Sequence, residues 1–156
     1  MPIEIMPFEP HNLEQVSKIE EQSFTDPWPQ ELFTVLSKRP SVTFLVGVGS
    51  GTVQGYAVGQ LDASIYPRNG HLIKRSGHIL NIAVSRESRR TGVGTLLMNE
   101  IERRLREKSA QTIRLEVRAS NTQAQHFYTK LGYRHTETVR LYYGDEDAYI
   151  MQKTLQ

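Results

Sequence analysis

The amino-acid sequence predicts a single mixed α/β domain over residues 1–156, with a central sheet of about seven strands and four helices. The chain length is that of one ordinary domain. Short apolar or alternating runs, which are typical of strands, are separated by segments whose apolar residues recur at the spacing of an amphipathic helix. An apolar run at 78–84, a helical segment and an alternating run follow one another, which predicts a right-handed crossover between two parallel strands.

The N-terminal part is predicted to contain a short strand at 3–6 and two helices. Asn12 and Gln15 have the spacing of a capping box, and apolar residues follow them at helical intervals. Two prolines flank a tryptophan within 23–29, so this segment must interrupt the first helix. A short second helix is expected at 31–37.

A hairpin with strands at 43–48 and 53–61 is expected next, because a Gly-Ser-Gly turn joins the two runs. The stretch 62–77 is expected to be a long connection, since it carries the turn residues Pro67, Asn69 and Gly70. The run at 78–84 is nearly continuous in apolar residues, which is typical of a strand covered on both faces.

The C-terminal part is predicted to hold two helices and three strands. A helix begins at Gly92, because apolar residues recur there in steps of four. A strand follows at 112–117, and Asn121 caps a short helix that Gly132 ends. Two closing strands are expected at about 134–141 and 148–154, with the turn 144–147 between them.

The composition excludes several classes of function. The sequence has no cysteine, so disulfides, cysteine-ligated metals and a cysteine nucleophile are excluded. The five histidines show no His-x-x-x-His spacing, and no metal site is expected. Neither a signal peptide nor a membrane-spanning apolar stretch is visible, so we expect a cytoplasmic protein that does not contact membranes.

The charge balance gives little indication of a nucleic-acid partner. Nineteen Lys and Arg against seventeen Asp and Glu leave a net charge of +2. We interpret the basic cluster Arg103, Arg104 and Arg106 as a solvated helix face, although contact with ribosomal RNA is an alternative interpretation. No specific nucleic-acid binding is expected.

The most informative motif is Arg89-Arg-Thr-Gly-Val-Gly-Thr95, which lies between a predicted strand and a predicted helix. Its glycines allow close backbone approach, and the free N–H groups and dipole of the helix start favour phosphate. The motif is not a P-loop, because no Lys-Ser/Thr pair follows the glycines, and it is a poor dinucleotide fingerprint. A glycine-rich turn with solvated arginines is the plainer alternative.

The motif resembles the coenzyme A pyrophosphate loop of the GNAT superfamily of N-acetyltransferases, and further matches occur in the family's order. The series is similar to the branch that acetylates protein N-termini, including ribosomal-protein alanine acetyltransferases and their archaeal relatives. The resemblance is strong over 78–151 and weaker over 1–77, where Asp26-Pro-Trp and the element order match. The further matches are Asn81-Ile-Ala-Val84, Leu115-Glu-Val-Arg-Ala-Ser-Asn121, Phe127-Tyr128, Leu131-Gly-Tyr133 and Tyr142-Tyr-Gly-Asp-Glu-Asp-Ala148.

This resemblance implies acetyl-CoA as cosubstrate and assigns its contacts. Backbone groups of three strand residues would pair with the pantetheine arm, and the glycine-rich loop would hold the pyrophosphate with support from Arg89. Asn121 would hydrogen-bond the arm, although helix capping is the commoner use of Asn at such a position. Tyr128 would also contact the cosubstrate. The strand residues are Ile82, Ala83 and Val84, and the loop residues are Arg90, Thr91, Gly92, Val93, Gly94 and Thr95.

The resemblance also implies two catalytic residues, Glu116 as general base and Tyr128 as general acid. Glu116 alternates with buried residues and shares its strand face with Arg114 and Arg118, so a solvated, ion-paired position is the alternative. Tyr128 lies on the inner stripe of its helix, where core packing is the alternative. Asp26 is a second candidate for the base. By its position at a strand end, the Val84 N–H is the candidate donor to the oxyanion.

Two segments are expected to bind the peptide substrate. Phe24, Asp26 and Trp28 in the first, and Tyr142 and Tyr143 in the second, would wall a slot for an N-terminus. Asp26 would hold the incoming ammonium group. Packing within the fold is the alternative role of Trp28 and of the two tyrosines.

We therefore expect a peptide α-N-acetyltransferase that works by direct attack in a ternary complex. A GNAT enzyme that acetylates lysine side chains or a small amine, and a non-catalytic CoA-binding regulatory module, are the alternatives. The preferred N-termini, the oligomeric state and a possible association with the ribosome are not fixed by the sequence.

Overall fold

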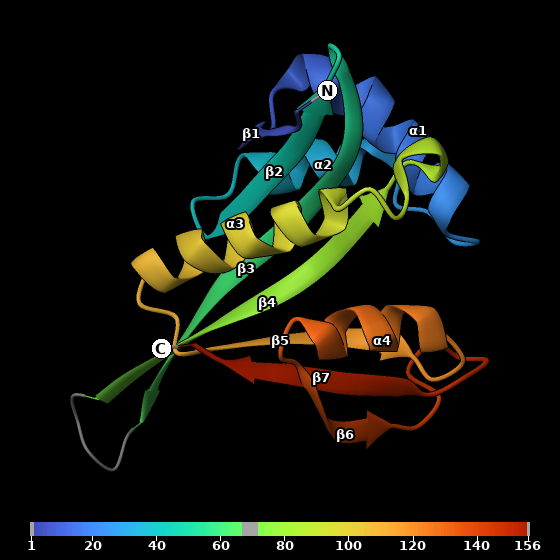
Figure 1. The fold of residues 1–156 in the computed structure, drawn as a ribbon. Helices are drawn as coiled ribbons and strands as arrows, with labels where there is room; N and C mark the ends of the chain where they lie inside the picture. The colour runs from blue at the N-terminus through green and yellow to red at the C-terminus, as the bar shows by residue number, and fades with distance from the viewer. Residues whose placement is uncertain (1, 67–71, 156) are drawn as a thin grey trace. The chain divides into compact units, whose positions relative to one another are not determined.

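The computed structural model describes residues 2–66 and 72–155, which form a seven-stranded sheet in the order β1-β2-β3-β4-β5-β7-β6 together with four α-helices (Figure 1). The predicted mixed α/β class, with these numbers of strands and helices, is confirmed. The elements are β1 (Glu4–Pro7), α1 (Leu13–Ser23), α2 (Gln30–Ser37), β2 (Val42–Gly49), β3 (Thr52–Tyr66), β4 (Leu72–Val84), α3 (Val93–Glu107), β5 (Thr112–Arg118), α4 (Thr122–Lys130), β6 (Arg134–Val139) and β7 (Ala148–Thr154), with short 3-10 helices η1 (Pro10–Asn12) and η3 (Arg86–Ser88).

The contacts between residues divide the chain into two compact units. The first unit comprises Met1–Gln60 and Leu80–Glu107, and the second comprises Leu61–Ile79 and Lys108–Gln156. The strands β3 and β4 each pass from one unit into the other, and the chain crosses a third time after α3, between Glu107 and Lys108.

In the first unit, the antiparallel strands β1, β2 and β3 carry helices on both faces. The α3 face is closely packed at two glycines of β3. A Cβ atom at Gly55 would lie 3.0 Å from Val93 Cγ1, and one at Gly59 would lie 2.8 Å from Ile101 Cδ1. These positions have no room for a side chain because α3 lies directly over them.

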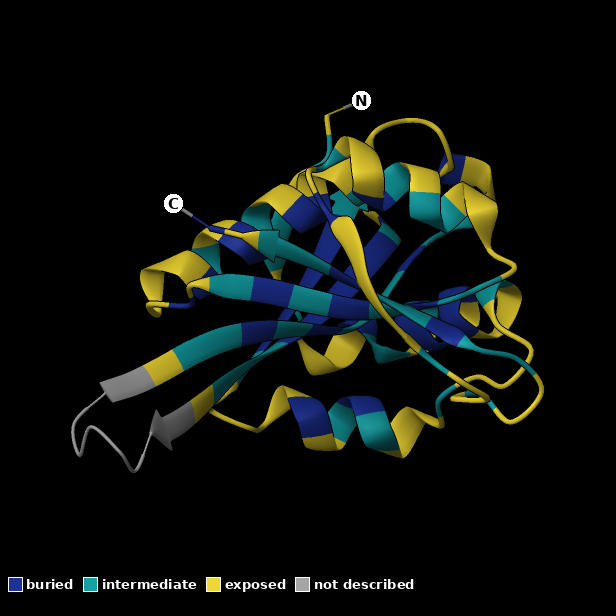
Figure 2. Cartoon of the chain, turned by 90° about the horizontal axis from the view of Figure 1, so that it is seen from below, coloured by how far each residue is buried: buried dark blue, intermediate teal, exposed yellow. Residues whose placement is uncertain are grey.

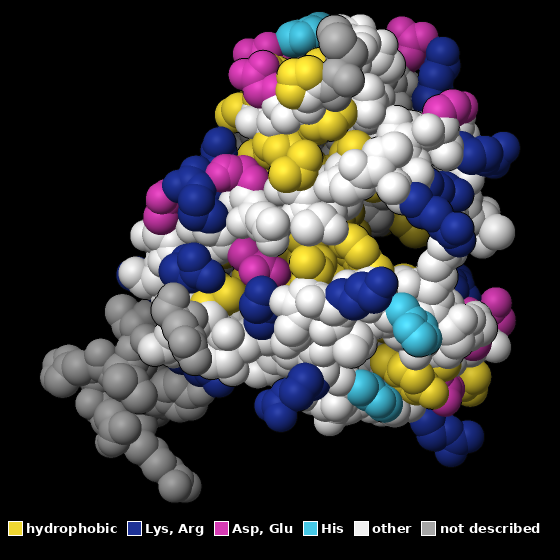
Figure 3. Space-filling model, in the orientation of Figure 1, with side chains coloured by type: hydrophobic (Ala, Val, Ile, Leu, Met, Phe, Trp, Pro, Cys, Tyr) yellow, Lys and Arg dark blue, Asp and Glu magenta, His cyan; other side chains and the backbone are white. Residues whose placement is uncertain are grey.

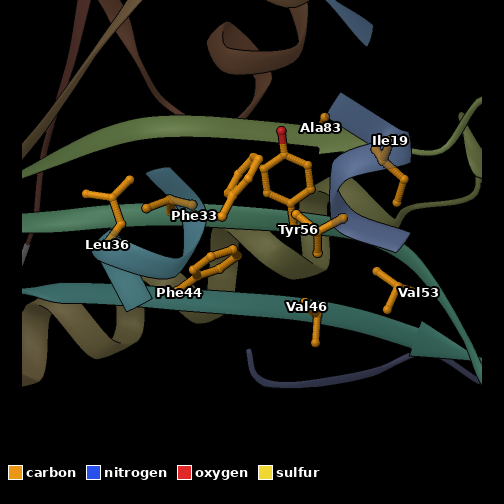
Figure 4. Packing of buried hydrophobic residues seen from close by; sticks show 10 residues of the cluster. Ile19, Phe33, Leu36, Phe44, Val46, Val53, Tyr56 and Ala83 are labelled. Carbon is orange, nitrogen blue, oxygen red and sulfur yellow. The ribbon is translucent and has the colours of Figure 1, made fainter. Parts of the chain in front are cut away.

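The opposite face of these strands holds an aromatic core beneath α1 and α2 (Figure 4). The Phe33 ring centroid lies 5.8 Å from that of Phe44 and 5.5 Å from that of Tyr56, the latter in an edge-on arrangement. Edge-on aromatic packing adds to the stability that apolar burial provides. The Tyr56 hydroxyl projects from this cluster toward the strand that carries Ala83.

The second unit is built around β5, whose side chains alternate between buried and partly exposed positions. β4 pairs with β5 in parallel, His78 opposite Arg114, which confirms the predicted parallel pairing of these two strands. β7 pairs with β5 in antiparallel fashion. Ile113, Leu115 and Val117 are buried on one face, so Arg114, Glu116 and Arg118 lie on the other. Figure 2 shows that the helices also carry buried residues on one side and exposed residues on the other.

The predicted long connection over 62–77 is wrong. β3 continues to Tyr66 and β4 begins at Leu72, while Pro67, Asn69 and Gly70 lie outside the described residues. The sequence pattern failed here because it detects strands by apolar residues on a buried face. Strand pairing depends on backbone hydrogen bonds, which polar residues such as Asp62 and Lys74 make equally well.

The predicted capping box at the start of α1 is also wrong. The Asn12 side chain accepts a hydrogen bond of 2.8 Å from the Glu9 N–H instead of capping α1. The Gln15 side chain accepts one of 2.8 Å from the Val53 N–H, so it ties α1 to β3. Tertiary partners thus replaced the local pairing that the spacing predicted.

Candidate active site

The glycine-rich loop of the first unit leads from η3 into the start of α3. Arg90 and Gly92 both have positive φ angles, of 64° and 92°. A Cβ atom at Gly92 would meet nothing within 4 Å, so glycine is favoured there by its backbone conformation and not by lack of space. The Leu96 N–H makes a helical hydrogen bond to Gly92 O at 3.0 Å, so the N–H groups of Val93, Gly94 and Thr95 precede the helical ladder.

The side chains around this loop fix its conformation and leave polar groups at its surface. Thr91 donates to the Ser88 carbonyl oxygen, and Ser88 itself is buried. Arg89 donates through Nε to Val84 O at 3.3 Å and contacts Ser23 Oγ at 3.5 Å. Arg89, Arg90 and Thr95 are exposed, so the helix start presents free N–H groups beside two guanidinium groups. This combination suits a phosphate group.

The strand end that precedes the loop holds the three residues predicted to pair with a cosubstrate. Ala83 is buried, whereas Ile82 and Val84 are partly exposed. The Ile82 N–H is engaged by the Oδ1 atom of its neighbour Asn81 at 3.1 Å. The Val84 carbonyl oxygen accepts the hydrogen bond from Arg89. The Val84 N–H is the group predicted to donate to an oxyanion.

A buried carboxylate in α1 was not singled out from the sequence. Glu20 is 1% exposed and accepts hydrogen bonds from Asn81 Nδ2 at 2.8 Å, from the Trp28 N–H at 2.9 Å and from the Tyr56 hydroxyl. Burial, together with the Glu20 charge, raises the Tyr56 pKa, so this hydroxyl stays protonated and donates. The signal in the sequence was a glutamate on the apolar stripe of a predicted helix. A charge at such a buried position needs several hydrogen-bond partners, so it marks a network within the fold.

The segment between α1 and α2 contains the first group of predicted substrate-binding residues. Phe24 is 39% exposed although it is apolar, and Asp26 is also exposed. Trp28 is only partly exposed, and its ring packs against the core with its centroid 5.4 Å from that of Phe33. Phe24 and Asp26 are therefore available to a ligand, while Trp28 anchors the segment to the first unit.

In the second unit, Glu116 forms a close pair with His78, a residue that was not predicted as part of the site. His78 Nε2 lies 2.8 Å from Glu116 Oε1 and 2.9 Å from Oε2, and the two side chains are 18% and 15% exposed. His78 and Arg114 are opposite each other in the register, and Glu116 is two residues along the same face. A histidine at the start of the nearly continuous apolar run at 78–84 was the signal that could have identified it.

The two arginines beside Glu116 on its strand pair with other carboxylates. Arg114 contacts Asp62 at 3.3 Å and His78 Nδ1 at 3.3 Å. Arg118 contacts Asp145 at 3.0 Å and Glu146 at 3.1 Å. The expected ion-paired strand face is present, but Glu116 itself bonds to an imidazole and a phenol.

The segment between β6 and β7 carries that phenol. The Tyr142 hydroxyl lies 3.4 Å from Glu116 Oε1, and burial together with the Glu116 charge raises the Tyr142 pKa. The Arg118 guanidinium lies over the Tyr143 ring at 4.2 Å, while burial, with Tyr142 and Glu116 nearby, raises the Tyr143 pKa to about 12. Leu141, beside them, is 58% exposed and has a positive φ of 52°.

Charged hydrogen bonds hold this segment against the end of β5. Besides the Arg118 contacts, Ser120 donates through Oγ to Glu146 at 3.1 Å. The Leu141 N–H donates to Asp147 Oδ1 at 2.8 Å. The hydrogen bond from Arg118 lowers the pKa of Asp145, and bonds from Ser120 and Arg118 lower that of Glu146. Both carboxylates therefore stay ionised at neutral pH.

α4 contributes the remaining two predicted site residues. Tyr128 is buried, its ring packs edge-on near Tyr133 with centroids 5.9 Å apart, and burial raises its pKa. Its hydroxyl therefore carries its proton at neutral pH and is not a phenolate. The Asn121 side-chain oxygen accepts from the Ala124 N–H at 3.0 Å, so this side chain caps α4 as predicted.

Charged side chains of both signs lie on the surface of the described residues. Lys, Arg, Asp and Glu side chains are interspersed on the face shown in Figure 3. On α3, Arg103 bonds to both Glu100 and Glu107, in keeping with the interpretation of the basic cluster as a solvated helix face. Within 2–66 and 72–155, no three His, Asp or Glu residues gather in a way that could hold a metal ion. No helix in these ranges is long and apolar enough to cross a membrane.

Known proteins are similar to this chain in both sequence and fold. The sequence model of the acetyltransferase (GNAT) family matches residues 13–133. An N-alpha-acetyltransferase of Sulfurisphaera tokodaii is 33% identical over 92% of this chain and 88% of its own. The crystal structure of Ard1 from Thermoplasma volcanium has a TM-score of 0.82 and 32% identity, covering 99% of this chain and 98% of that chain. Naa20 from Chaetomium thermophilum, crystallised with a bisubstrate analogue, has a TM-score of 0.84 and 31% identity, covering 97% and 86%.

Proposed function

Because this chain belongs to the acetyltransferase (GNAT) family, we propose that it transfers the acetyl group of acetyl-CoA to the α-amino group of protein N-termini by direct attack. The observation that carries the chemical part of the proposal is the Glu116 carboxylate, which is largely buried and bonded to His78 and Tyr142. Relatives named N-alpha-acetyltransferases support the choice of acceptor. The absence of cysteine supports transfer without a thioester on the protein.

The glycine-rich loop and the end of β4 are proposed to bind acetyl-CoA. The N–H groups of Val93–Thr95 and the charges of Arg89 and Arg90 suit the pyrophosphate. Backbone groups of Ile82, Ala83 and Val84 would pair with the pantetheine arm as a further strand does. The Asn121 amide nitrogen would reach the arm, since its oxygen is used in the cap.

Proton transfer is proposed to rest on Glu116 and Tyr128. An α-ammonium group has a pKa of about 8 against about 10.4 for lysine, so a modest base can neutralise a protein N-terminus. Glu116, directly or through a water molecule, would accept the proton, with His78 fixing the carboxylate in place. Asp26, which is exposed, is the alternative base.

The reaction itself forms one bond and breaks one. The neutral amine attacks the thioester carbonyl carbon, the amide C–N bond forms and the C–S bond breaks. The Val84 N–H would donate to the carbonyl oxygen as negative charge develops on it. The departing thiolate would take a proton from Tyr128, whose raised pKa keeps the hydroxyl protonated at neutral pH. The first residues of the peptide would contact Phe24 and Asp26 in one segment and Tyr142 and Tyr143 in the other. Trp28 would hold the segment between α1 and α2 in place.

The proposal is tested by incubating the protein with acetyl-CoA and short peptides that differ in their first two residues. We expect mass spectrometry to show one added acetyl group on the α-nitrogen of a subset of them. A peptide with a blocked N-terminus and an internal lysine is the control, and acetylation of that lysine at a comparable rate would favour a side-chain acetyltransferase. Absence of turnover on every amine would refute the enzymatic proposal.

A further inference from the structure

Glu20 lies at the meeting point of two segments to which the proposed function gives different ligands. One of its carboxylate oxygens, Oε2, accepts the Trp28 N–H at 2.9 Å. Trp28 belongs to the segment between α1 and α2, which is proposed to contact the peptide. The other oxygen, Oε1, accepts from Asn81 Nδ2 at 2.8 Å and from the Tyr56 hydroxyl. One buried carboxylate thus connects a loop to two strands.

Asn81 extends this connection to the strand that is proposed to bind acetyl-CoA. Its side-chain oxygen accepts from the Ile82 N–H at 3.1 Å, while its side-chain nitrogen donates to Glu20. The carboxamide is therefore held at both ends, and a ligand carbonyl that takes the Ile82 N–H competes with the oxygen of Asn81. A buried and charged hydrogen-bond network is costly to leave incomplete, so a change at one member is passed to the next.

We propose that Glu20 is a positioning residue that couples the binding of acetyl-CoA and peptide, through the chain Ile82–Asn81–Glu20–Trp28. This inference rests on the proposed function. When the cosubstrate engages the Ile82 N–H, the Asn81 side-chain oxygen is released, while the side-chain nitrogen keeps its bonds to Glu20 Oε1 at 2.8 Å and to the Tyr56 hydroxyl at 3.2 Å. The carboxamide can then turn to the geometry that best suits Glu20. The carboxylate is then fixed more firmly, and so is the Trp28 backbone. The peptide segment is ordered before the peptide arrives, and acetyl-CoA binding strengthens peptide binding.

Tyr56 provides a control because it bonds to Glu20 and accepts a hydrogen bond of 3.2 Å from Asn81 Nδ2, but lies outside the direct chain Ile82–Asn81–Glu20–Trp28. Asn81→Ala removes the connection between β4 and Glu20. Tyr56→Phe removes the hydrogen bonds that the hydroxyl makes with Glu20 and Asn81, but leaves the direct Asn81–Glu20 and Glu20–Trp28 hydrogen bonds. Glu20→Gln keeps the shape of the side chain but removes its charge. Two of these variants target the connection itself, and Tyr56→Phe measures the effect of losing a hydrogen bond to Glu20.

The experiment measures peptide binding by calorimetry, with and without saturating coenzyme A, which lacks the acetyl group and allows no turnover. The peptide is the best substrate of the panel described above. We expect coenzyme A to tighten peptide binding of the wild-type protein by at least about fivefold, within the usual range of coupled sites. This factor should fall close to one in Asn81→Ala and Glu20→Gln but persist in Tyr56→Phe. By reciprocity, the peptide should tighten coenzyme A binding by the same factor.

Three outcomes would overturn the proposed coupling: a wild-type factor of one, an unchanged factor in Asn81→Ala, or an equal loss in Tyr56→Phe. Circular dichroism and thermal unfolding of each variant show whether it is folded, and Asn81→Ala decides the case if Glu20→Gln does not fold. Failure of the proposed function is recognised separately, since the wild-type protein would then neither bind coenzyme A nor acetylate a peptide.

Discussion

At the scale of single residues, the partners of Glu116 define what this side chain can do. Its sequence neighbours on the same strand face are arginines, which would hold a carboxylate as a stable anion of low basicity. In the folded chain these arginines pair with Asp62, Asp145 and Glu146, and Glu116 bonds to His78 and Tyr142 instead. Neither arginine therefore pairs with Glu116, which we propose as the proton acceptor.

Glu116→Gln should lower kcat by at least about a hundredfold, because the amide cannot accept the proton of the attacking amine. The KM for acetyl-CoA should change little, since the groups proposed to bind it belong to other residues. Steady-state acetylation of the best peptide measures both constants. Asp62→Asn, which alters the partner of Arg114 on the same face, is the control. A comparable loss in that variant would show that the charge pattern of the face matters more than Glu116 itself.

Tyr128→Phe should lower kcat without changing the pH profile below about pH 10. Burial raises the pKa of this phenol above its ordinary value of about 10, so the hydroxyl keeps its proton as the pH rises through the neutral and mildly alkaline range. The wild-type rate should therefore not fall through ionisation of Tyr128 in that range. Measurements of kcat against pH in both proteins test this. An alkaline decline that is present in the wild type and absent from the variant would contradict it.

At the scale of elements, the segment between β6 and β7 is shaped by its contacts with the end of β5. Arg118 bonds to two carboxylates of the segment and lies over the Tyr143 ring. Leu141, whose N–H donates to Asp147, has a left-handed conformation, and its apolar side chain is exposed. The proposed peptide contacts of Tyr142 and Tyr143 therefore depend on Arg118, an arginine to which no catalytic role is assigned.

Arg118→Lys should raise the KM for peptide by roughly three- to tenfold, because lysine cannot reproduce the planar fork or the stacked contact. The KM for acetyl-CoA should be unchanged, and amide hydrogen exchange within 140–147 should become faster. Arg103→Lys is the matched control, since Arg103 also bonds to two carboxylates but lies on α3. Equal effects of the two substitutions on the KM for peptide would argue against a specific role for Arg118.

Gly92→Ala should weaken binding of coenzyme A, as measured by calorimetry. The φ of 92° is unfavourable for any residue with a Cβ atom, at a cost of about 1–2 kcal/mol, although the space around it is open. The loop would relax to a negative φ and turn the N–H groups at the start of α3. Gly51→Ala is a control at another positive-φ glycine with open surroundings, in the β2–β3 hairpin. Weaker coenzyme A binding in both variants would indicate a general loss of stability.

At the scale of the whole molecule, close packing of α3 on β3 sets how much change the first unit tolerates. Gly59→Ala should lower the free energy of unfolding by about 1–3 kcal/mol, because the added Cβ would lie 2.8 Å from Ile101 Cδ1. Denaturant unfolding measures this, and Gly59→Ala combined with Ile101→Val should recover part of the loss. An undiminished stability of the single variant would show that the Ile101 side chain turns aside without cost.

The fold class could be predicted from the sequence because periodic apolar residues, the Asn121 cap and Gly132 are local signals that agree with one another. The extent of β3 and β4 could not, since polar strand segments carry no apolar pattern. In the site, the glycine-rich loop was visible as a continuous motif. The role of Glu20 and the pairing of His78 with Glu116 were hidden, because they join residues 61 and 38 positions apart in the chain.

The division of the chain into two units has a consequence for its evolution. The first unit contains the candidate phosphate-binding loop, and the second contains the candidate proton-transfer pair. The chain passes between them inside β3, inside β4 and again after α3, so the boundary of the units is not made of loops alone. Recombination that divided the units would cut two paired strands. Changes in acceptor preference are therefore expected to arise by substitution within the α1–α2 and β6–β7 segments, and not by shuffling of whole units.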